Sequence, residues 1–384
     1  CANHQQLIAQ AMKAIHEAAG PAAADPHRLH IHFMAPAAWI NDPNGLIFFN
    51  GEYHMFYQIH PYSAENGPKH WGHARSKDLL HWEHLPAALA PGEDYDRNGC
   101  FSGTAVESEG RMMLIYTGNV FRDGRKIQVQ CLASSDDGVH FHKYRANPVI
   151  GEFPADGSAD FRDPKVWRHQ DTWYMAVGSG KDGRGNALLY RSHDLHDWRY
   201  AGKMAESRSE EEGSVWNCPD FFRVGDKDVL MVSPAVWKGN RHQVRKVLYY
   251  IGRMDYEQGR FLIESAGVVD YGWDFYAPQT LVDDQGRVIL IAWMDMWFND
   301  MPTKAHGWAG AMTLPREVYL TGRGKLGFRP VRELSRLRGV EHAAEAFRLD
   351  GGDEAALPCA GAVFELELVF AAETYTEVEF TLRE

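Results

Sequence analysis

The chain has 384 residues, 45% of them hydrophobic, which is enough to bury the core of one large domain or of two ordinary ones. Its 52 acidic and 40 basic residues give a formal net charge of −12, and a surface of this sign repels a phosphate backbone, so no nucleic-acid partner is expected. No run of about 18 apolar residues occurs, which excludes a membrane-spanning helix and a membrane partner.

The first segment, residues 1–26, is expected to be a helix that caps the domain. Apolar residues recur there at helical spacing, unlike the unbroken apolar stretch of a signal peptide: Leu7, Ile8, Ala11, Met12 and Ile15. The five cysteines of the chain are widely spaced and include no CxxC pair, which fits a reducing compartment. These features predict a cytoplasmic protein.

Short strand-like runs recur through residues 27–335. Equivalent positions in five of these runs serve as anchors: Tyr57, Tyr116, Val177, Val232 and Ala292. Successive anchors are 59, 61, 55 and 60 residues apart, close to the length of one propeller blade. Long amphipathic helices are missing from this region, which disfavours a helix bundle or a βαβ fold. An all-β, five-bladed propeller is therefore predicted, and a β-sandwich with accidental turn spacing is the alternative.

A second repeat supports the blades. The segment Ser76–Trp82 reappears as Ser192–Trp198 and, more loosely, from Ser134 onward. These three serines are 58 residues apart each time. The repeat is typical of a strand followed by a polar turn and an aromatic residue that packs between neighbouring sheets.

Polar and aromatic clusters lie 14 to 18 residues before the anchors. They are Asn41-Asp42, Phe101-Ser102, Arg162-Asp163, Trp216-Asn217 and Asp274-Phe275-Tyr276. In a propeller, equivalent positions on the innermost strands face one central channel. The five clusters are therefore expected to converge on a single pocket.

Two carboxylates in these clusters could perform chemistry. Cleavage of a glycosidic bond with retention needs two carboxyl groups about 5–5.5 Å apart. Asp42 lies in an Asn-Asp-Pro-Asn-Gly stretch that could also be only a turn. Asp163 follows Arg162, which could keep it ionised or form a structural ion pair with it. The amides of Asn41 and Gln58 could recognise sugar hydroxyls.

Aromatic rings near these clusters could stack on a sugar, although each could also be a core residue. They are Trp39, Trp71, Phe101, Tyr276, Trp293 and Trp297. No His, Cys and Asp residues have the spacing of metal ligands, and no Gly-x-Ser-x-Gly elbow, phosphate loop or dinucleotide motif occurs. No metal or cofactor is expected, and acyl hydrolases and nucleotide enzymes are disfavoured.

The combination of motifs resembles glycoside hydrolase family 32, the β-fructofuranosidases that include invertases and bacterial sucrose-6-phosphate hydrolases. The resemblance runs from Asp25 to about Arg338. Its motifs are Trp39–Gly45, His70–Ala74, Cys100–Gly103, Phe161–Lys165, Trp216–Asp220, Asp274–Gln279, Gly307–Gly310 and Leu314–Glu317.

The resemblance implies a five-bladed propeller followed by a β-sandwich, a β-fructoside such as sucrose or sucrose-6-phosphate as substrate, and no cofactor. Asp42 would be the nucleophile that forms a fructosyl-enzyme, and Asp163 the transition-state stabiliser. Substrate-binding residues would be Trp39, Asn41, Gln58, Trp71, Phe101, Ser102, Arg162, Tyr276 and Trp293. Residues 340–384, with strands expected at Ala362–Leu368 and Thr376–Leu382, would be the incomplete start of the sandwich.

One position departs from the family pattern. The family's general acid/base is the Glu of a Trp-Glu-Cys-Pro-Asp motif, and this chain has Asn217 there. An amide cannot transfer the proton, and loss of general acid–base catalysis costs about 10²–10⁴-fold in rate. The carboxylates nearest in sequence are Asp220, Glu211 and Glu212. The chain is thus expected to be an acid/base-deficient enzyme, with a non-catalytic carbohydrate-binding propeller, a fructosyltransferase or a fructan hydrolase as alternatives.

Overall fold

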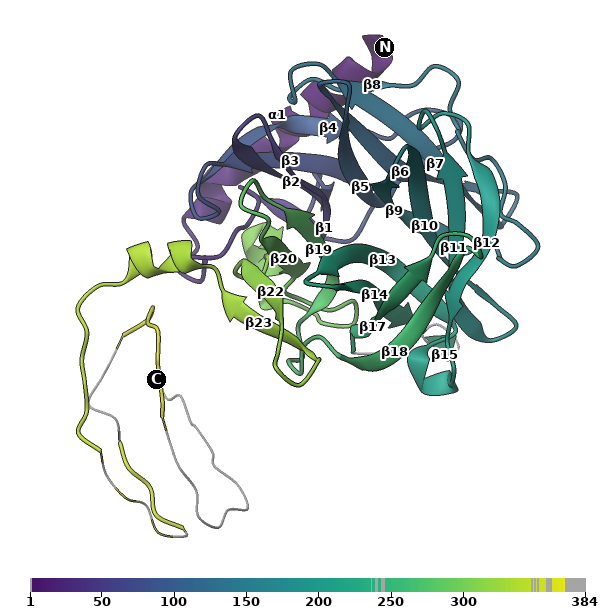
Figure 1. Cartoon of the computed structure of the whole chain (residues 1–384). Coiled ribbons are helices and arrows are strands. Elements are labelled where there is room, and N and C mark those ends of the chain that lie inside the picture. Colours follow the sequence, from purple (N-terminus) through teal and green to yellow (C-terminus); the bar gives the residue numbers. More distant parts are fainter. Residues whose placement is uncertain are drawn as a thin grey trace. The chain divides into compact units, whose positions relative to one another are not determined.

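The structure is a computed structural model that describes residues 2–235, 237–238, 241–242, 246–346, 348, 350, 352–356 and 361–369. It divides into two compact units, Cys1–Glu333 and Leu334–Glu384. The first unit consists almost entirely of antiparallel strands that surround a common axis (Figure 1). Within the part of the chain that the structure describes, no helix is long and apolar enough to span a membrane.

Five sheets form the blades of a propeller, which confirms the predicted fold of this region. Blade I contains β1 (Ala38–Phe49), β2 (Glu52–His60), β3 (His70–Ser76) and β4 (Trp82–Leu89). Blade II contains β5 (Cys100–Ser108), β6 (Arg111–Arg122), β7 (Arg125–Ser135) and β8 (His142–Lys143). Blade III contains β9 (Phe161–His169), β10 (Thr172–Lys181), β11 (Arg184–Ser192) and β12 (Arg199–Glu206).

The remaining blades follow the same order. Blade IV contains β13 (Val215–Val224), β14 (Lys227–Ala235), β17 (Leu248–Asp255) and β18 (Arg260–Val268). Blade V contains β19 (Tyr276–Val282), β20 (Val288–Trp293), β22 (Arg316–Leu320) and β23 (Leu326–Pro330). The short strands β15 (Trp237–Lys238) and β16 (Arg241–His242) pair with each other, and the 3-10 helices are η1 (Glu210–Glu212), η2 (Pro302–His306) and η3 (Arg332–Leu337).

The innermost strands β1, β5, β9, β13 and β19 pack side by side in a closed ring. The five anchor residues all lie on the second strand of a blade, because each blade repeats the same hairpin order. The ring is closed by β21 (Trp308–Ala309), which lies between β20 and β22 of blade V in sequence but pairs in parallel with Ala38–Trp39 of blade I. The polar starts of the inner strands therefore lie around one axis.

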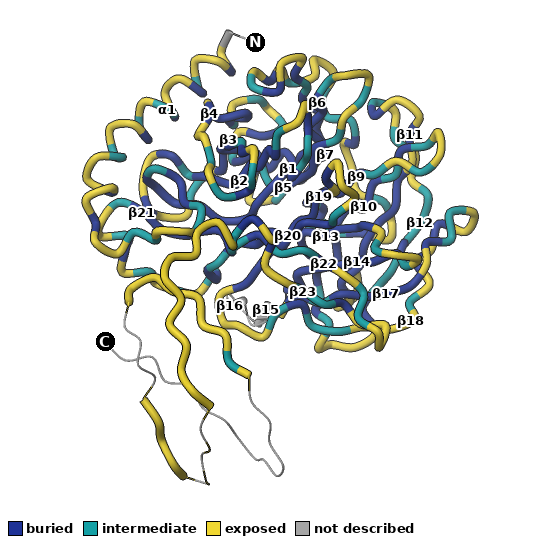
Figure 2. Tube along the Cα trace, turned by 60° about the vertical axis from the view of Figure 1, so that its left-hand side comes forward, coloured by how far each residue is buried: buried dark blue, intermediate teal, exposed yellow. Residues whose placement is uncertain are grey.

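Each interface between consecutive blades from I to V holds a buried apolar cluster. Between blades I and II, for example, Phe56 and Trp71 pack with Leu114 and Tyr116. Between blades III and IV, Leu189 packs in one cluster with Trp216 and Leu230. Burial is accordingly concentrated on the inner and middle strands, as the dark blue segments of Figure 2 show. This packing gives each inner strand a rigid support on both sides.

The N-terminal helix α1 (Ala2–Ala23) covers the outer edge of blade I (Figures 1 and 2). The edge strand β4 would otherwise present unpaired backbone N–H groups. Met12 Sδ accepts a hydrogen bond from the Ala87 N–H at 3.3 Å, and His4 Nε2 accepts one from the Ala90 N–H at 3.1 Å. Burial lowers the pKa of His4 to about 3, so its imidazole is neutral and can accept this bond.

The polar turns repeat in a register that differs by one residue from the expected one. In all three turns a serine Oγ donates to the Asp two positions later: Ser76 to Asp78 at 3.1 Å, Ser135 to Asp137 at 2.9 Å and Ser192 to Asp194 at 3.1 Å. The alignment of Ser134 is therefore wrong, and Ser135 is the equivalent residue. The residue three places after each serine has a left-handed φ, which sets the register: Leu79 (65°), Gly138 (72°) and Leu195 (67°).

The second unit differs from the expected strand pattern. Residues 361–369 contain no assigned strand, and Val363, Phe364 and Leu366 are exposed. Alternating residues form a strand only when a neighbouring strand takes up the backbone hydrogen bonds, and the described residues of this unit provide no such neighbour. The other expected strand, Thr376–Leu382, lies outside the described residues, so the β-sandwich stays a prediction.

Candidate active site

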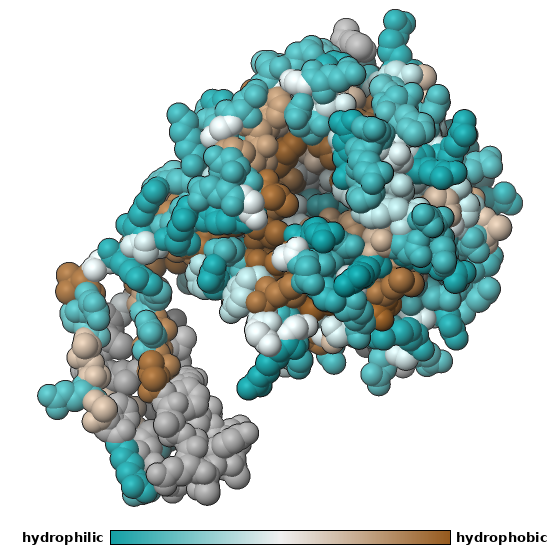
Figure 3. Space-filling model, viewed as in Figure 1, coloured by the Kyte–Doolittle hydropathy of each residue, from teal (hydrophilic) through white to brown (hydrophobic). Residues whose placement is uncertain are grey.

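The candidate site lies at the starts of the five inner strands. At each start the pairing with the second strand shifts register, as at a β-bulge: in β1 between Ile40 and Pro43, in β5 between Phe101 and Gly103, in β9 between Arg162 and Lys165, in β13 between Asn217 and Asp220, and in β19 between Tyr276 and Gln279. Bulges re-aim side chains and are common next to active sites. In the space-filling view, apolar residues gather toward the middle of the propeller face with hydrophilic residues around them (Figure 3).

Asp42 is held at both carboxylate oxygens. Ser102 Oγ, from blade II, donates to Asp42 Oδ2 at 2.8 Å. Asn41 Nδ2 donates to Asp42 Oδ1 at 3.1 Å, and Asn41 Oδ1 in turn accepts from Trp39 Nε1 at 3.2 Å. Asp42 is only 6% exposed. Its orientation is therefore determined by neighbours on two blades.

Asp163 adopts a left-handed backbone conformation, with φ of 63°. Its N–H donates to Thr117 Oγ1 at 2.9 Å, and its Oδ2 accepts from the Cys218 N–H at 3.0 Å. Burial raises the pKa of Asp163 to about 6, since the guanidinium of Arg162, 4.0 Å away, offsets the burial only in part and Asp42 adds to the shift. Strained backbone of this kind is often found at functional sites.

Cys218 joins the two carboxylates. Its Sγ lies 3.5 Å from Asp42 Oδ2 and 3.4 Å from Asp163 Oδ2, so these two oxygens are at most 6.9 Å apart. Burial raises the pKa of the Cys218 thiol well above its usual range, so the sulfur stays protonated and acts as a hydrogen-bond donor. Residues from blades I, III and IV thus meet around one sulfur atom.

Asn217 is turned toward blade V. Its Nδ2 donates to Tyr276 Oη at 2.8 Å, and Tyr276 Oη lies 3.5 Å from the Ser233 carbonyl oxygen. Asn217 Oδ1 is buried and has no hydrogen-bond partner among the described residues. The side chain at position 217 is thus a buried amide with one hydrogen bond, and its place as the acid/base position stays a prediction.

Two of the three carboxylates nearest to Asn217 in sequence form ion pairs with other residues. Asp220 is fully buried and pairs with Lys165 Nζ at 2.6 Å and with Thr280 Oγ1 at 2.6 Å. Glu212 accepts from the guanidinium of Arg208 at 2.8 Å, and Glu211 is exposed. Asp220 and Glu212 thus each have a cationic partner of their own.

Several predicted sugar-binding residues have packing roles in the structure. Trp71 is fully buried, and its Nε1 donates to the Phe101 carbonyl oxygen at 3.0 Å. Trp293 is also fully buried and packs against Trp39, with ring centroids 6.0 Å apart. Gln58 uses its Nε2 to bind the carbonyl oxygen of Cys100 at 3.0 Å. Their contact with a sugar stays a prediction.

The same face of blade I contributes a residue that the sequence did not reveal. Lys69 precedes β3, is 4% exposed, and places Nζ 5.5 Å from the centroid of the Trp39 ring. Burial lowers the pKa of Lys69 to about 7, against the attraction of Asp42. A lone lysine ahead of a strand carries no motif, so no sequence pattern pointed to it.

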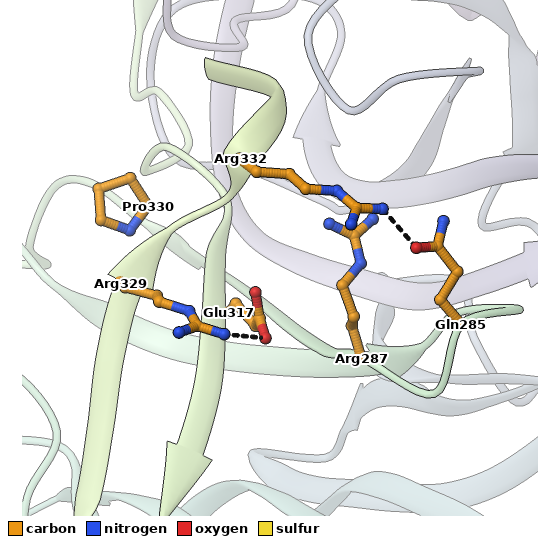
Figure 4. A pocket seen from close by; sticks show the side chains of 6 residues that line it. All are labelled: Gln285, Arg287, Glu317, Arg329, Pro330 and Arg332. Atoms are coloured by element: carbon orange, nitrogen blue, oxygen red, sulfur yellow. Dashed lines mark hydrogen bonds and ion pairs between the residues drawn. The ribbon is translucent and has the colours of Figure 1, made fainter. Parts of the chain in front are cut away.

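Two further observations concern ligands. Among the described residues, no three His, Cys, Asp or Glu side chains are placed to hold a metal ion. A surface groove of about 530 Å³ on blade V is lined by Gln285, Arg287, Glu317, Arg329, Pro330 and Arg332 (Figure 4). Its guanidinium groups already have partners, as Arg329 pairs with Glu317 and Arg287 with Glu333. None of the predicted site residues lines this groove.

Known proteins that are similar to this chain belong to the family that its motifs resemble. Residues 32–330 match the model of the glycosyl hydrolases family 32 N-terminal domain. A sucrose-6-phosphate hydrolase of Escherichia coli is 48% identical over 323 residues, which cover 80% of this chain and 65% of that protein. A sucrose-6-phosphate hydrolase of Zymomonas mobilis is 42% identical over 359 residues, covering 89% and 69%. The chain therefore spans about two thirds of the length of these relatives.

Solved structures of the same family superpose on this chain. The GH32 beta-fructofuranosidase of Bombyx mori superposes with a TM-score of 0.80 at 39% identity, covering 88% of this chain and 72% of that one. A mutant of the same protein in complex with sucrose superposes with a TM-score of 0.79, also at 39% identity, covering 86% and 71%.

Proposed function

The chain belongs to glycoside hydrolase family 32, and from this membership we propose that residues 27–335 form a retaining β-fructofuranosidase domain, with residues 1–26 as its helical cap. The proposed substrates are sucrose and sucrose-6-phosphate, because the Escherichia coli and Zymomonas mobilis relatives are sucrose-6-phosphate hydrolases and a mutant of the Bombyx mori beta-fructofuranosidase was solved with sucrose. The proposed location is cytoplasmic.

The observation that carries this proposal is the meeting of Asp42 and Asp163 at the thiol of Cys218. Asp42, fixed by Ser102 and Asn41, attacks C2 of the fructosyl group, and the bond from C2 to the glucosyl oxygen breaks. Asp163, which contacts the same sulfur, binds hydroxyl groups of the sugar and stabilises the positive charge that develops at the ring. Water then attacks C2 and Asp42 leaves.

Both steps of this reaction lack proton transfer at Asn217. The departing glucosyl oxygen has to take its proton from solvent, and the attacking water has no base beside it. We therefore propose that the chain turns over sucrose about 10²–10⁴-fold more slowly than its Glu-containing counterpart.

The test is the Asn217→Glu variant with sucrose as substrate. A gain of about 100-fold or more in kcat is expected, and Asp42→Asn in the same background should abolish it. The fructosyl-enzyme itself can be detected in the unchanged chain with an aryl β-fructofuranoside, whose leaving group needs no proton. Absence of turnover in Asn217→Glu together with absence of an aryl burst would contradict the proposal. Comparison of kcat/KM for sucrose and its 6-phosphate then decides between the two substrates.

A second candidate function is a carbohydrate-binding propeller without turnover, favoured by Asn217 alone. Calorimetric binding of sucrose with no hydrolysis in the Asn217→Glu variant would support it. Fructosyl transfer to a sugar acceptor, within the enzyme class, would be recognised by trisaccharide products at high sucrose.

A further inference from the structure

Lys69 is a buried cation without a close counter-charge. Its side chain is 4% exposed, and among the described residues Nζ has a hydrogen bond to Asn66 Oδ1 but no carboxylate within 4.0 Å. An unpaired ammonium in such a place lowers the stability of a fold. Packing alone therefore does not explain why a buried lysine without a paired carboxylate occupies this position.

Lys304 provides an internal comparison. Its Nζ also lies 5.5 Å from the centroid of the Trp39 ring. Lys304, however, pairs with Glu65 at 3.0 Å and with Asp300 at 3.1 Å. Two ammonium groups therefore contact one indole, but only the charge of Lys304 is neutralised by carboxylates.

Two paths of contacts lead from Lys69 to the carboxylate of Asp42. Through its side chain, Lys69 contacts the ring of Trp39, whose Nε1 holds Asn41, which holds Asp42 Oδ1. Through its backbone, the Lys69 carbonyl oxygen accepts from the Cys100 N–H at 2.9 Å, two residues before Ser102, which holds Asp42 Oδ2. Both oxygens of Asp42 are thus held by chains of contacts that begin at Lys69.

We propose that Lys69 is a positioning residue for the nucleophile: its ammonium, seated against Trp39 and attracted by Asp42, holds the Trp39–Asn41–Asp42 chain in place. The inference rests on the proposed role of Asp42 as the nucleophile. A cation over the face of an indole is attracted by the ring and polarises its N–H, which strengthens the bond from Trp39 to Asn41.

The charge of Lys69 changes near neutral pH. Burial lowers its pKa to about 7, with Asp42 of β1 opposing the shift. The other charged or titratable groups around it are His60 at the end of β2, Glu65 in the same loop, and Lys304 of η2 across the Trp39 ring. The ammonium is present below this pH and is lost above it. Formation of the fructosyl-enzyme should therefore slow as the pH rises through about 7.

The experiment measures the aryl-alcohol burst of the unchanged chain with an aryl β-fructofuranoside, from pH 5.5 to 8.5. Lys69→Met should slow the burst about tenfold, change KM little, and remove the decline near pH 7, because a misplaced nucleophile loses rate rather than affinity. Lys69→Arg should retain most of the rate. Lys13→Met, at an exposed lysine of α1, is the control and should change neither the rate nor the decline. A Lys69→Met variant with the rate and pH profile of the unchanged chain would overturn the proposal.

A thermal measurement tests the same inference without turnover. At pH 6, Lys69→Met should raise the Tm by about 2 °C or more, because it removes an unpaired buried charge. A lower Tm would identify Lys69 as a stabilising structural residue and would also overturn the proposal. If neither the unchanged chain nor Asn217→Glu gives a burst, the proposed function fails, whereas a burst that Lys69→Met leaves intact refutes only the role of Lys69.

Discussion

Asn217 and Tyr276 are joined by a hydrogen bond of 2.8 Å from the amide to the phenol, across the interface between blades IV and V. This bond satisfies one end of the amide, while Oδ1 at the other end is buried without a partner among the described residues. Position 217 is thus joined to the neighbouring blade by a hydrogen bond.

Removing the phenol should destabilise the protein. Tyr276→Phe leaves the Asn217 amide buried and unpaired, so the free energy of unfolding should fall by about 1–3 kcal/mol in urea denaturation. The double variant Asn217→Leu with Tyr276→Phe removes both polar groups and should recover most of the loss. Equal losses in the single and double variants would show that the unpaired amide of Asn217 is not the cause of the loss.

The pH dependence of catalysis should follow Asp163. Its pKa is raised to about 6, so the carboxylate that is proposed to stabilise the transition state is present above this pH and is lost as the pH falls. In the Asn217→Glu variant, for which activity is proposed, kcat/KM for sucrose should therefore decline below about pH 6.

Arg162 lowers the pKa of Asp163, so Arg162→Gln should move this decline to higher pH. Arg111→Gln, at an exposed ion pair with Asp136, serves as the control and should leave the profile unchanged. A decline at the same pH in all three proteins would show that another group controls it.

The ion pair of Lys165 with Asp220 should be important for stability. Both side chains lie on inner strands, Asp220 is fully buried, and the pair distance is 2.6 Å. Asp220→Asn leaves the ammonium of Lys165 uncompensated, and a loss of about 3–5 kcal/mol is expected in chemical denaturation. Asp136→Asn breaks the exposed pair with Arg111 and should cost less than about 1 kcal/mol. Similar losses for the two variants would contradict the expected difference.

Acid should destabilise the fold through two buried histidines in blade I. His54 Nδ1 and His73 Nε2 are 3.0 Å apart, and His73 stacks on Phe56 with ring centroids 4.1 Å apart. Burial lowers the pKa of His54 to about 4 and that of His73 well below its usual range. The unfolded chain therefore binds more protons than the folded one below about pH 6.5, and stability falls as the pH drops.

Each such proton changes the free energy of unfolding by about 1.4 kcal/mol per pH unit. His73→Gln should flatten the decline between pH 6.5 and 4.5, and the exposed residue His16, changed to Gln, should not. Parallel stability curves for the two variants would argue against a role for the histidine pair.

The repeat of the fold could be predicted because each blade carries its own copy of one hydrophobic strand. Tyr57 and Tyr116 are equivalent only because blades repeat, and the spacing revealed this directly. The register of the polar turns was harder to predict, because Ser134 and Ser135 are each followed two residues later by an Asp. Only the left-handed residue Gly138 decides between them.

The convergence of separate motifs could be predicted, since Asp42, Asp163 and Asn217 each lie in a contiguous motif and the structure brings the first two together at Cys218, next to Asn217, while their roles in catalysis stay predictions. It could not be predicted where contacts cross blades. Trp71 resembles a sugar-stacking residue in sequence, but its ring fills the interface between two sheets. Lys69 lies near the site only because the β2–β3 connection packs against Trp39. The sequence around Lys69 contains no pattern that predicts this packing.

Ring closure has a consequence for synthesis of the chain. Trp308–Ala309 pairs with Ala38–Trp39, and the Ala38 N–H donates to the Gly307 carbonyl oxygen at 2.8 Å. The segment that carries Trp39, Asn41 and Asp42 therefore finds its inner neighbour only after about 270 further residues have left the ribosome. A nascent chain shorter than this holds Asp42, the proposed nucleophile, on an open edge, so the proposed reactivity toward a fructoside would appear only in completed propellers.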